Sequence, residues 1–168
     1  MIQRARILAL SATFIALIAV GSWLSIPLPP VPITLQTLFV LLAGIVMTRY
    51  GVIPVALYIL LGAIGLPIYH NGTAGPGILL GPTGGFLVGF IPAALVVGLV
   101  YEHKSPKLRM AGLFAATAVT YAFGVAWLSF SASLSIYQAI LIGVAPFVVG
   151  DIVKIAAAYT IGKRVETG

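Results

Sequence analysis

The sequence contains no cysteine, which excludes disulfides and thiolate metal sites. Charged residues are also scarce, at 7% of the 168 residues, whereas about a quarter are charged in a typical soluble domain. Because 61% of the residues are hydrophobic and the mean hydropathy is +1.16, the chain could not cover its surface with polar groups in water. We therefore expect an all-α integral membrane protein.

The motifs of several common enzyme chemistries are missing as well. The nearest match to a P-loop is Gly162-Lys163-Arg164, which lacks the Ser or Thr that would hold magnesium after the lysine. The two histidines, His70 and His103, have no second His, Cys or carboxylate at ligand spacing, which argues against a metal site. No expected helix carries a histidine that could activate a serine. These absences favour a binding or transport protein without a cofactor over an enzyme.

The positions of the charges divide the chain into three long uncharged stretches. Residues 7–48, 50–101 and 110–150 contain no Asp, Glu, Lys or Arg. A helix needs about 20 apolar residues to cross a bilayer, so each stretch is long enough for two crossings.

Each uncharged stretch is interrupted near its middle by residues that break helices. The interruptions are the proline-rich segment 26–34, the glycine- and proline-rich segment 65–85 and the serine-rich segment 129–135. Three stretches folded once each predict a single membrane domain over residues 1–168 with six transmembrane helices, at 5–26, 34–48, 50–66, 83–101, 109–128 and 137–162.

The basic residues indicate how this bundle is oriented. Eight of the nine fall in the termini and connections of one side, namely Arg4, Arg6, Arg49, Lys104, Lys107, Arg109, Lys163 and Arg164. By the positive-inside rule, we expect a multi-pass protein of the cell membrane with both termini in the cytoplasm. This accounts for the net charge of +6 without nucleic acid as a partner. The first apolar run is too long for a signal peptide, so we expect an uncleaved first helix.

One acid and one base lie inside the last expected helix. Asp151 and Lys154 are three residues apart and therefore share a helix face. Each charge costs about 2.5–3.5 kcal/mol in the middle of a membrane, and pairing offsets part of that cost. Two interpretations stay open: a structural ion pair that neutralises itself, or a polar substrate site facing the bundle interior. Pro146 can loosen the backbone nearby, and the expected depth places such a pocket in the outer half, under the extracellular loops.

Three segments of the sequence match a known family in combination. They are "PPVPITLQTLFVLLAG" (29–44), "LGAIGLPIYHNGTAGPGILLGPTGGFLVGF" (61–90) and "PFVVGDIVK" (146–154). Together they resemble the biotin-specific S component of energy-coupling factor (ECF) transporters over nearly the whole chain. The resemblance implies a six-helix subunit in the lipid bilayer that captures biotin from outside. It also implies docking onto a transmembrane coupling protein that carries two ATPase subunits.

The polar residues of these segments suit the groups of biotin. An ionised Asp151 only accepts hydrogen bonds and suits the ureido N–H groups, while Lys154 only donates and suits the ureido carbonyl or the carboxylate tail. The resemblance adds Asn71, from a loop that lies over the site in the family, and Gln36, at the outer start of the second helix. His70 is expected to be a solvated loop histidine.

Other residues of the same segments suit the apolar part of biotin. Tyr69 and Phe86 could sandwich the bicyclic ring system. The family usually has Tyr at the position of Phe86, which puts any hydrogen bond from that position in doubt. Thr83, Gly84 and Gly85 could let the backbone approach the ligand closely, or Thr83 could simply be the N-cap of the following helix.

The first helix carries a pattern that suits docking. Ala5 and Ala9 are four residues apart, as are Ala12 and Ala16, and small residues at this spacing let another helix approach closely. Alanine is common in membrane helices, so the pattern alone is weak. The resemblance implies that such a patch contacts the coupling protein, and Ala12 and Ala16 match it better.

Two other functions are consistent with the residues alone. The first is a stand-alone secondary transporter of small molecules, coupled to protons through Asp151. The second is a membrane scaffold in which the pair of Asp151 and Lys154 is purely structural.

Overall fold

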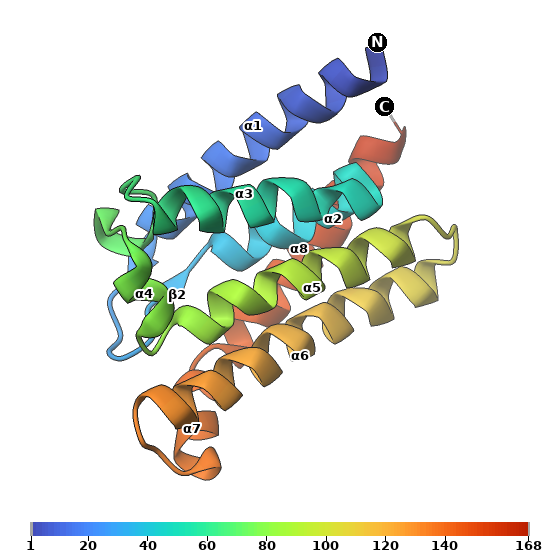
Figure 1. The fold of residues 1–168 in the computed structure, drawn as a ribbon. Helices are drawn as coiled ribbons and strands as arrows, with labels where there is room; N and C mark the ends of the chain where they lie inside the picture. Colours follow the sequence, from blue (N-terminus) through green and yellow to red (C-terminus); the bar gives the residue numbers. More distant parts are fainter. Residues whose placement is uncertain (1, 168) are drawn as a thin grey trace.

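Helices make up most of the protein, and a small β-hairpin lies at one end of the helical bundle (Figure 1). The computed structural model describes residues 2–167. Its elements in chain order are α1 (Ile2–Trp23), β1 (Ser25–Ile26), β2 (Ile33–Thr34), α2 (Gln36–Met47), the 3₁₀ helix η1 (Thr48–Gly51), α3 (Val52–Ala63), the 3₁₀ helix η2 (His70–Gly72), α4 (Pro76–Leu80), α5 (Gly84–Tyr101), α6 (Pro106–Ser131), α7 (Ile136–Gly143) and α8 (Val148–Thr167).

Several helical stretches are apolar and long enough to cross a membrane. Within residues 2–167 there are four, at Gln3–Trp23, Gln36–Ala63, Gly84–Tyr101 and Pro106–Ser131. The bent pair of α7 and α8 would make a fifth. The prediction of a helical membrane protein is therefore confirmed.

The stretch Gln36–Ala63 folds back on itself at η1. The Gln36 Nε2 donates to the Tyr58 hydroxyl at 2.7 Å, although 22 residues of continuous helix would separate them by about 33 Å. The reversal begins at Thr48, whose φ of 51° and ψ of −136° end α2. The helix α3 ends at Ala63, three residues before the end of the expected 50–66, because the chain turns at Gly65, where φ is +117°.

The last expected helix, 137–162, is two helices in the structure. Helices α7 and α8 are separated by residues 144–147 and meet at a bend of 55°. Pro146 has no backbone N–H to donate to the preceding turn, which favours a break here, although α5 runs continuously through Pro92. As a result Asp151 lies in the first turn of α8, near the positive end of the helix dipole, rather than in the middle of a long helix.

Helix α5 packs at the centre of the bundle, against α2, α3 and α6. Gly85 and Gly89 face α6, and a Cβ at either position would collide with the side chain of Trp127 or Phe123. Small residues let these helices approach closely, as is common for helix pairs in membranes. The tight α5–α6 pair fixes one wall of the pocket described below.

The two ends of the bundle differ. Figure 1 shows both termini at one end and the β-hairpin with α4 at the opposite end. The terminal end also carries η1 and the α5–α6 connection, which a bidentate ion pair joins: Arg49 Nε and Nη2 lie 2.6 and 2.7 Å from the Glu102 carboxylate oxygens. The basic connections counted in the sequence thus gather at the end that holds the termini.

Candidate functional site

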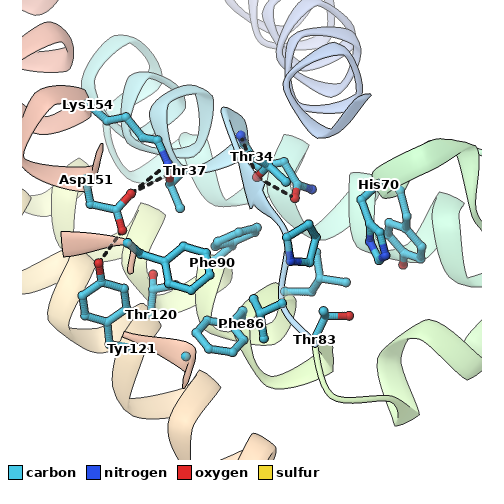
Figure 2. Close-up of a pocket in the computed structure, with 17 residues that line it drawn as sticks. Thr34, Thr37, His70, Thr83, Phe86, Phe90, Thr120, Tyr121, Asp151 and Lys154 are labelled. Atoms are coloured by element: carbon cyan, nitrogen blue, oxygen red, sulfur yellow. Dashed lines mark hydrogen bonds and ion pairs between the residues drawn. The ribbon is translucent and has the colours of Figure 1, made fainter. Parts of the chain in front are cut away.

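A pocket lies toward the hairpin end of the bundle and encloses about 590 Å³ of empty space, part of which is open to solvent. Its walls come from the segment before α2, from the η2 loop and from α2, α5, α6, α7 and α8 (Figure 2). The lining residues are Val31, Pro32, Thr34, Gln36, Thr37, Tyr69, His70, Thr83, Phe86, Leu87, Phe90, Thr120, Tyr121, Gly143, Phe147, Asp151 and Lys154.

The two charges form a buried cluster on one side of this pocket. Asp151 is 5% exposed and Lys154 is 8% exposed. The Lys154 Nζ lies 2.8 Å from Asp151 Oδ1 and donates to the Thr37 hydroxyl at 3.0 Å. The Thr37 hydroxyl donates to Asp151 Oδ1 at 3.4 Å, and the Tyr121 hydroxyl donates to Asp151 Oδ2. Thr37 of α2 and Tyr121 of α6 therefore bond the pair on α8, which explains how an apolar chain can bury it.

The cluster keeps unused hydrogen-bonding capacity. Lys154 has three N–H donors and uses two of them within residues 2–167. Among the described residues, Asp151 Oδ2 accepts a hydrogen bond only from Tyr121, so one of its lone-pair sites is open. One free donor beside one free acceptor complements a ligand group that presents both an N–H and a C=O.

Gln36 lines the pocket, but much of its amide serves the fold. Its Nε2 donates to the Tyr58 hydroxyl, and its Oε1 accepts from the Thr34 hydroxyl at 3.2 Å. The Tyr58 hydroxyl in turn donates to the carbonyl of Ile68 at 2.9 Å. The start of α2 is thereby tied to α3 and to the loop that carries His70. Within the described part of the chain, the second N–H of the Gln36 amide makes no hydrogen bond and stays available to a ligand.

Aromatic rings form much of the apolar lining. Tyr69 is fully buried and packs edge-to-face on Tyr58, with 5.6 Å between ring centroids. Its hydroxyl donates to the carbonyl of Ile59 at 2.5 Å, and burial raises the pKa of Tyr69 to about 12. The ring of Phe86 fills space that a side chain at Gly124 would need. Both expected ring partners of the ligand therefore do line the pocket.

The loop at the far side of the pocket differs from expectation. His70 is half-buried and lines the pocket, opposite the charged pair in Figure 2, rather than being a solvated loop residue. Burial lowers its pKa below the ordinary 6.5, so the ring is uncharged at neutral pH. Asn71 is exposed, adopts a left-handed φ of 55° and accepts from the Ser25 hydroxyl at 3.3 Å. It does not line the pocket within the described residues.

Of the three residues expected near the ligand in the segment around Thr83, only some line the pocket. Thr83 lines the pocket, and within residues 2–167 its side chain makes no capping hydrogen bond to α5. Gly84 and Gly85 do not line it. A Cβ at Gly84 would collide with the backbone of Leu79, and one at Gly85 with Trp127. These glycines bring α4 and α6 close to α5, rather than bringing the backbone close to a ligand.

Several pocket residues were not expected from the sequence. Thr37 and Tyr121 are the most important, because both bond the buried carboxylate. Thr37 directly follows Gln36 in a segment already singled out, so adjacency was a usable signal. Tyr121 lies 30 residues from Asp151, in a different helix, and only the packing of α6 on α8 brings them together.

The four alanines of α1 lie on the outside of the bundle. Ala5, Ala9, Ala12 and Ala16 are all exposed, while Phe14 and Ile18 are buried on the opposite face. The alanines therefore leave a narrow strip of small side chains accessible along α1.

These features define a class of protein: a helical membrane protein that holds a small ligand with polar and apolar parts inside its bundle. Within that class the chain belongs to the BioY family, whose family model matches residues 1–168. It is 46% identical to a biotin transporter of Thermotoga maritima over 155 residues, 91% of each chain. It is 37% identical to a probable biotin transporter of Pyrococcus horikoshii over 165 residues, 98% of each chain.

A solved structure has the same fold. The S component for biotin from an ECF-type ABC transporter superposes with a TM-score of 0.90 at 26% sequence identity. The match covers 99% of this chain and 93% of that chain. The resemblance inferred from the three sequence segments is confirmed.

Proposed function

We propose that this protein is the biotin-binding S component of an ECF transporter and takes up biotin across the cell membrane. The observation that carries the proposal is the buried pair of Asp151 and Lys154 at one side of an aromatic pocket, with one acceptor and one donor unused. The names of the relatives point to the same substrate.

The geometry favours one orientation of biotin. The ureido ring presents N–H donors and a carbonyl side by side, which match the open site on Asp151 and the free N–H of Lys154. The carboxylate tail would be repelled by Asp151 if it lay there. It therefore points to the other side of the pocket, toward Thr83 and His70. The rings of Tyr69 and Phe86 contact the apolar body between the two ends.

The proposed topology has six crossings and both termini in the cytoplasm. The reversal at η1 supports two crossings for Gln36–Ala63, in addition to α1, α5, α6 and the α7–α8 pair. The gathering of basic connections at the terminal end supports a cytoplasmic position for that end. The pocket then opens toward the outside, beneath the hairpin and the η2 loop.

The proposed partners are a transmembrane coupling protein and two ATPase subunits. The exposed alanine strip of α1 supports docking there, with Ala12 and Ala16 as the main contacts and Ala5 and Ala9 nearer the terminal end. ATP hydrolysis is assigned to the partners, since this chain has no P-loop.

Calorimetric titration of the purified protein with biotin tests the proposal. We expect saturable binding by the wild type, and strong weakening in Asp151→Asn and in Lys154→Ala. Circular dichroism shows whether each variant keeps its helices. A wild type that does not bind biotin contradicts the proposed substrate. Folded variants that bind as well as the wild type contradict the assigned site.

A second candidate is a stand-alone secondary transporter coupled to protons. The buried carboxylate of Asp151, which lines the pocket, favours it, because intramembrane acids often carry protons in transporters. Biotin uptake by cells that lack any coupling subunit, and its collapse with the proton gradient, would support this candidate over the first.

A further inference from the structure

A second polar opening lies at the terminal end, between α1 and the α2–η1 turn. This groove encloses about 540 Å³ of empty space, part of which is open to its surroundings. It exists because α1 packs least closely on the bundle at its N-terminal end. Residues 3–6 are exposed, while Phe14, Ile18 and Ser22 are buried. In Figure 1, α1 diverges from the other helices toward its N-terminal end.

The mouth of the groove is lined by polar side chains that are open to a ligand. These are Gln3, Arg6 and Tyr50. Arg6 and Tyr50 are exposed, and within residues 2–167 neither the Arg6 guanidinium nor the Tyr50 hydroxyl makes a hydrogen bond. A guanidinium offers several N–H donors in a planar fork that matches the oxygens of a phosphate.

The inner walls of the groove are apolar. Ile7 and Leu10 of α1 face Val46 and Met47 of α2 across it. These helices lie in stretches that are apolar enough to span a membrane, so the groove opens where lipid surrounds the protein. A cation at the mouth and hydrocarbon walls below it match a ligand with an anionic head and an apolar chain.

The charge of this end favours an anion further. All eight basic residues outside the buried pair lie in its connections and termini. At this end the structure describes the side chain of one acid, Glu102, and it is already paired with Arg49. Basic openings between membrane helices are typical binding places for anionic phospholipid headgroups.

We propose that this groove binds one anionic phospholipid, with its phosphate on Arg6 and Tyr50 and the start of an acyl chain along Ile7 and Leu10. A free phosphate ion would leave the apolar walls unused. The site is independent of the pocket that holds Asp151 and of the substrate bound there.

Native mass spectrometry of the purified, delipidated protein tests this proposal. Phosphatidylglycerol is titrated against phosphatidylcholine with matched acyl chains. We expect the wild type to bind phosphatidylglycerol more tightly and Arg6→Ala to bind it about fivefold more weakly, the effect of one basic residue at an anionic surface. Lys104→Ala, an exposed charge of the same end that does not line the groove, is the matched control and should bind as the wild type.

A second pair of variants tests the apolar walls. Ile7→Trp fills the groove and should weaken phosphatidylglycerol binding while Arg6 is retained. Leu8→Trp, on the exposed side of the same helix, should have no effect. Thermal unfolding verifies that all variants are folded. Equal binding of the two lipids, an Arg6→Ala variant that binds as the wild type, or an equal loss in Lys104→Ala would each overturn the proposal. So would binding of inorganic phosphate that matches binding of the lipid.

Discussion

Asp151 accepts hydrogen bonds from three side chains of three helices, so this one residue organises the charged side of the pocket. Lys154 supplies the compensating charge, and Thr37 and Tyr121 complete the shell. A buried pair of this kind usually adds little net stability, because removing two ions from water costs about as much as their attraction returns. A site that binds a polar ligand is a better reason to keep the pair than stability is.

Tyr121 is expected to position the carboxylate. In Tyr121→Phe the ring stays and the hydroxyl is lost, so Asp151 Oδ2 loses its only described donor. A hydrogen bond to a charged group contributes about 1.5–3 kcal/mol, and we expect a loss of stability in this range. Without this anchor the carboxylate can rotate, and we expect biotin to bind about tenfold more weakly, which corresponds to about 1.4 kcal/mol.

Thermal unfolding and calorimetric titration measure the two effects of Tyr121→Phe. Tyr137→Phe is the matched control, because Tyr137 is 71% exposed and does not line the pocket. An unchanged affinity in a less stable Tyr121→Phe variant would leave Tyr121 a purely structural role.

A double substitution separates the structural role of the pair from its role in binding. Lys154→Met leaves Asp151 buried without its counter-charge, and breaking a buried pair in this way costs about 3–5 kcal/mol. Adding Asp151→Asn removes the stranded charge and should restore much of the stability, as measured by thermal unfolding. Biotin binding should be lost in both variants. Recovery of binding along with stability would contradict the assigned site.

At the scale of the elements, the η2 loop carries the only pocket histidine among residues 2–167. Because burial lowers the pKa of His70 in the folded protein, the unfolded chain takes up a proton that the folded protein resists. The resulting loss in the free energy of unfolding is absent above the unfolded pKa of about 6.5. It grows as the pH falls below that value toward the lowered pKa. We therefore expect the unfolding temperature to drop between pH 7.5 and pH 5.

His70→Gln should make that drop in unfolding temperature smaller, whereas His103→Gln, in the exposed α5–α6 connection, should leave it unchanged. Unfolding scans at several pH values check this. A pH dependence that survives in His70→Gln would assign it to other groups.

The sequence predicted the elements better than it predicted the contacts between them. The spacing of charges and the breaker segments placed α1, α5 and α6 within a few residues, because both signals lie along the chain. The division of the last helix at Pro146 was not predicted, because a proline can either kink a membrane helix or divide it, and the sequence alone does not say which. The position of the break then places Asp151 in the first turn of α8.

The candidate site could be predicted where a charged residue lies inside an apolar helix, because such residues are rare. Asp151 and Lys154 could be found in this way, and the family resemblance added Gln36, Tyr69 and Phe86. Thr37 and Tyr121 are ordinary residues of apolar helices, and only tertiary packing gives them a role. A glycine in the sequence indicates that something approaches the backbone closely, but it does not identify the neighbour. At Gly84 and Gly85 the neighbours are other helices.

At the scale of the whole molecule, the alanine strip of α1 and the pocket are on separate surfaces. We expect Ala12→Trp and Ala16→Trp to weaken assembly with the coupling protein about tenfold or more, because a large side chain holds the helices apart. Biotin binding should be unchanged. Pull-down with the coupling complex and calorimetric titration measure the two properties. Phe130→Trp, an exposed position on α6, is the control.

Loss of both properties in Ala16→Trp would indicate misfolding rather than a docking surface. Assembly that matches the wild type in both tryptophan variants would contradict docking through α1.

The mutual bond between Lys154 and Asp151 has a consequence for the empty protein. A carrier must return without its cargo, and a vacant site lined by two isolated charges would then be the least stable point of every cycle. Here the charges pair with each other, so a ligand at the proposed site would add hydrogen bonds to a pair that is already neutral, rather than rescue unpaired ions. Its departure would leave the same neutral pair behind. The empty protein therefore carries no stranded charge in its pocket.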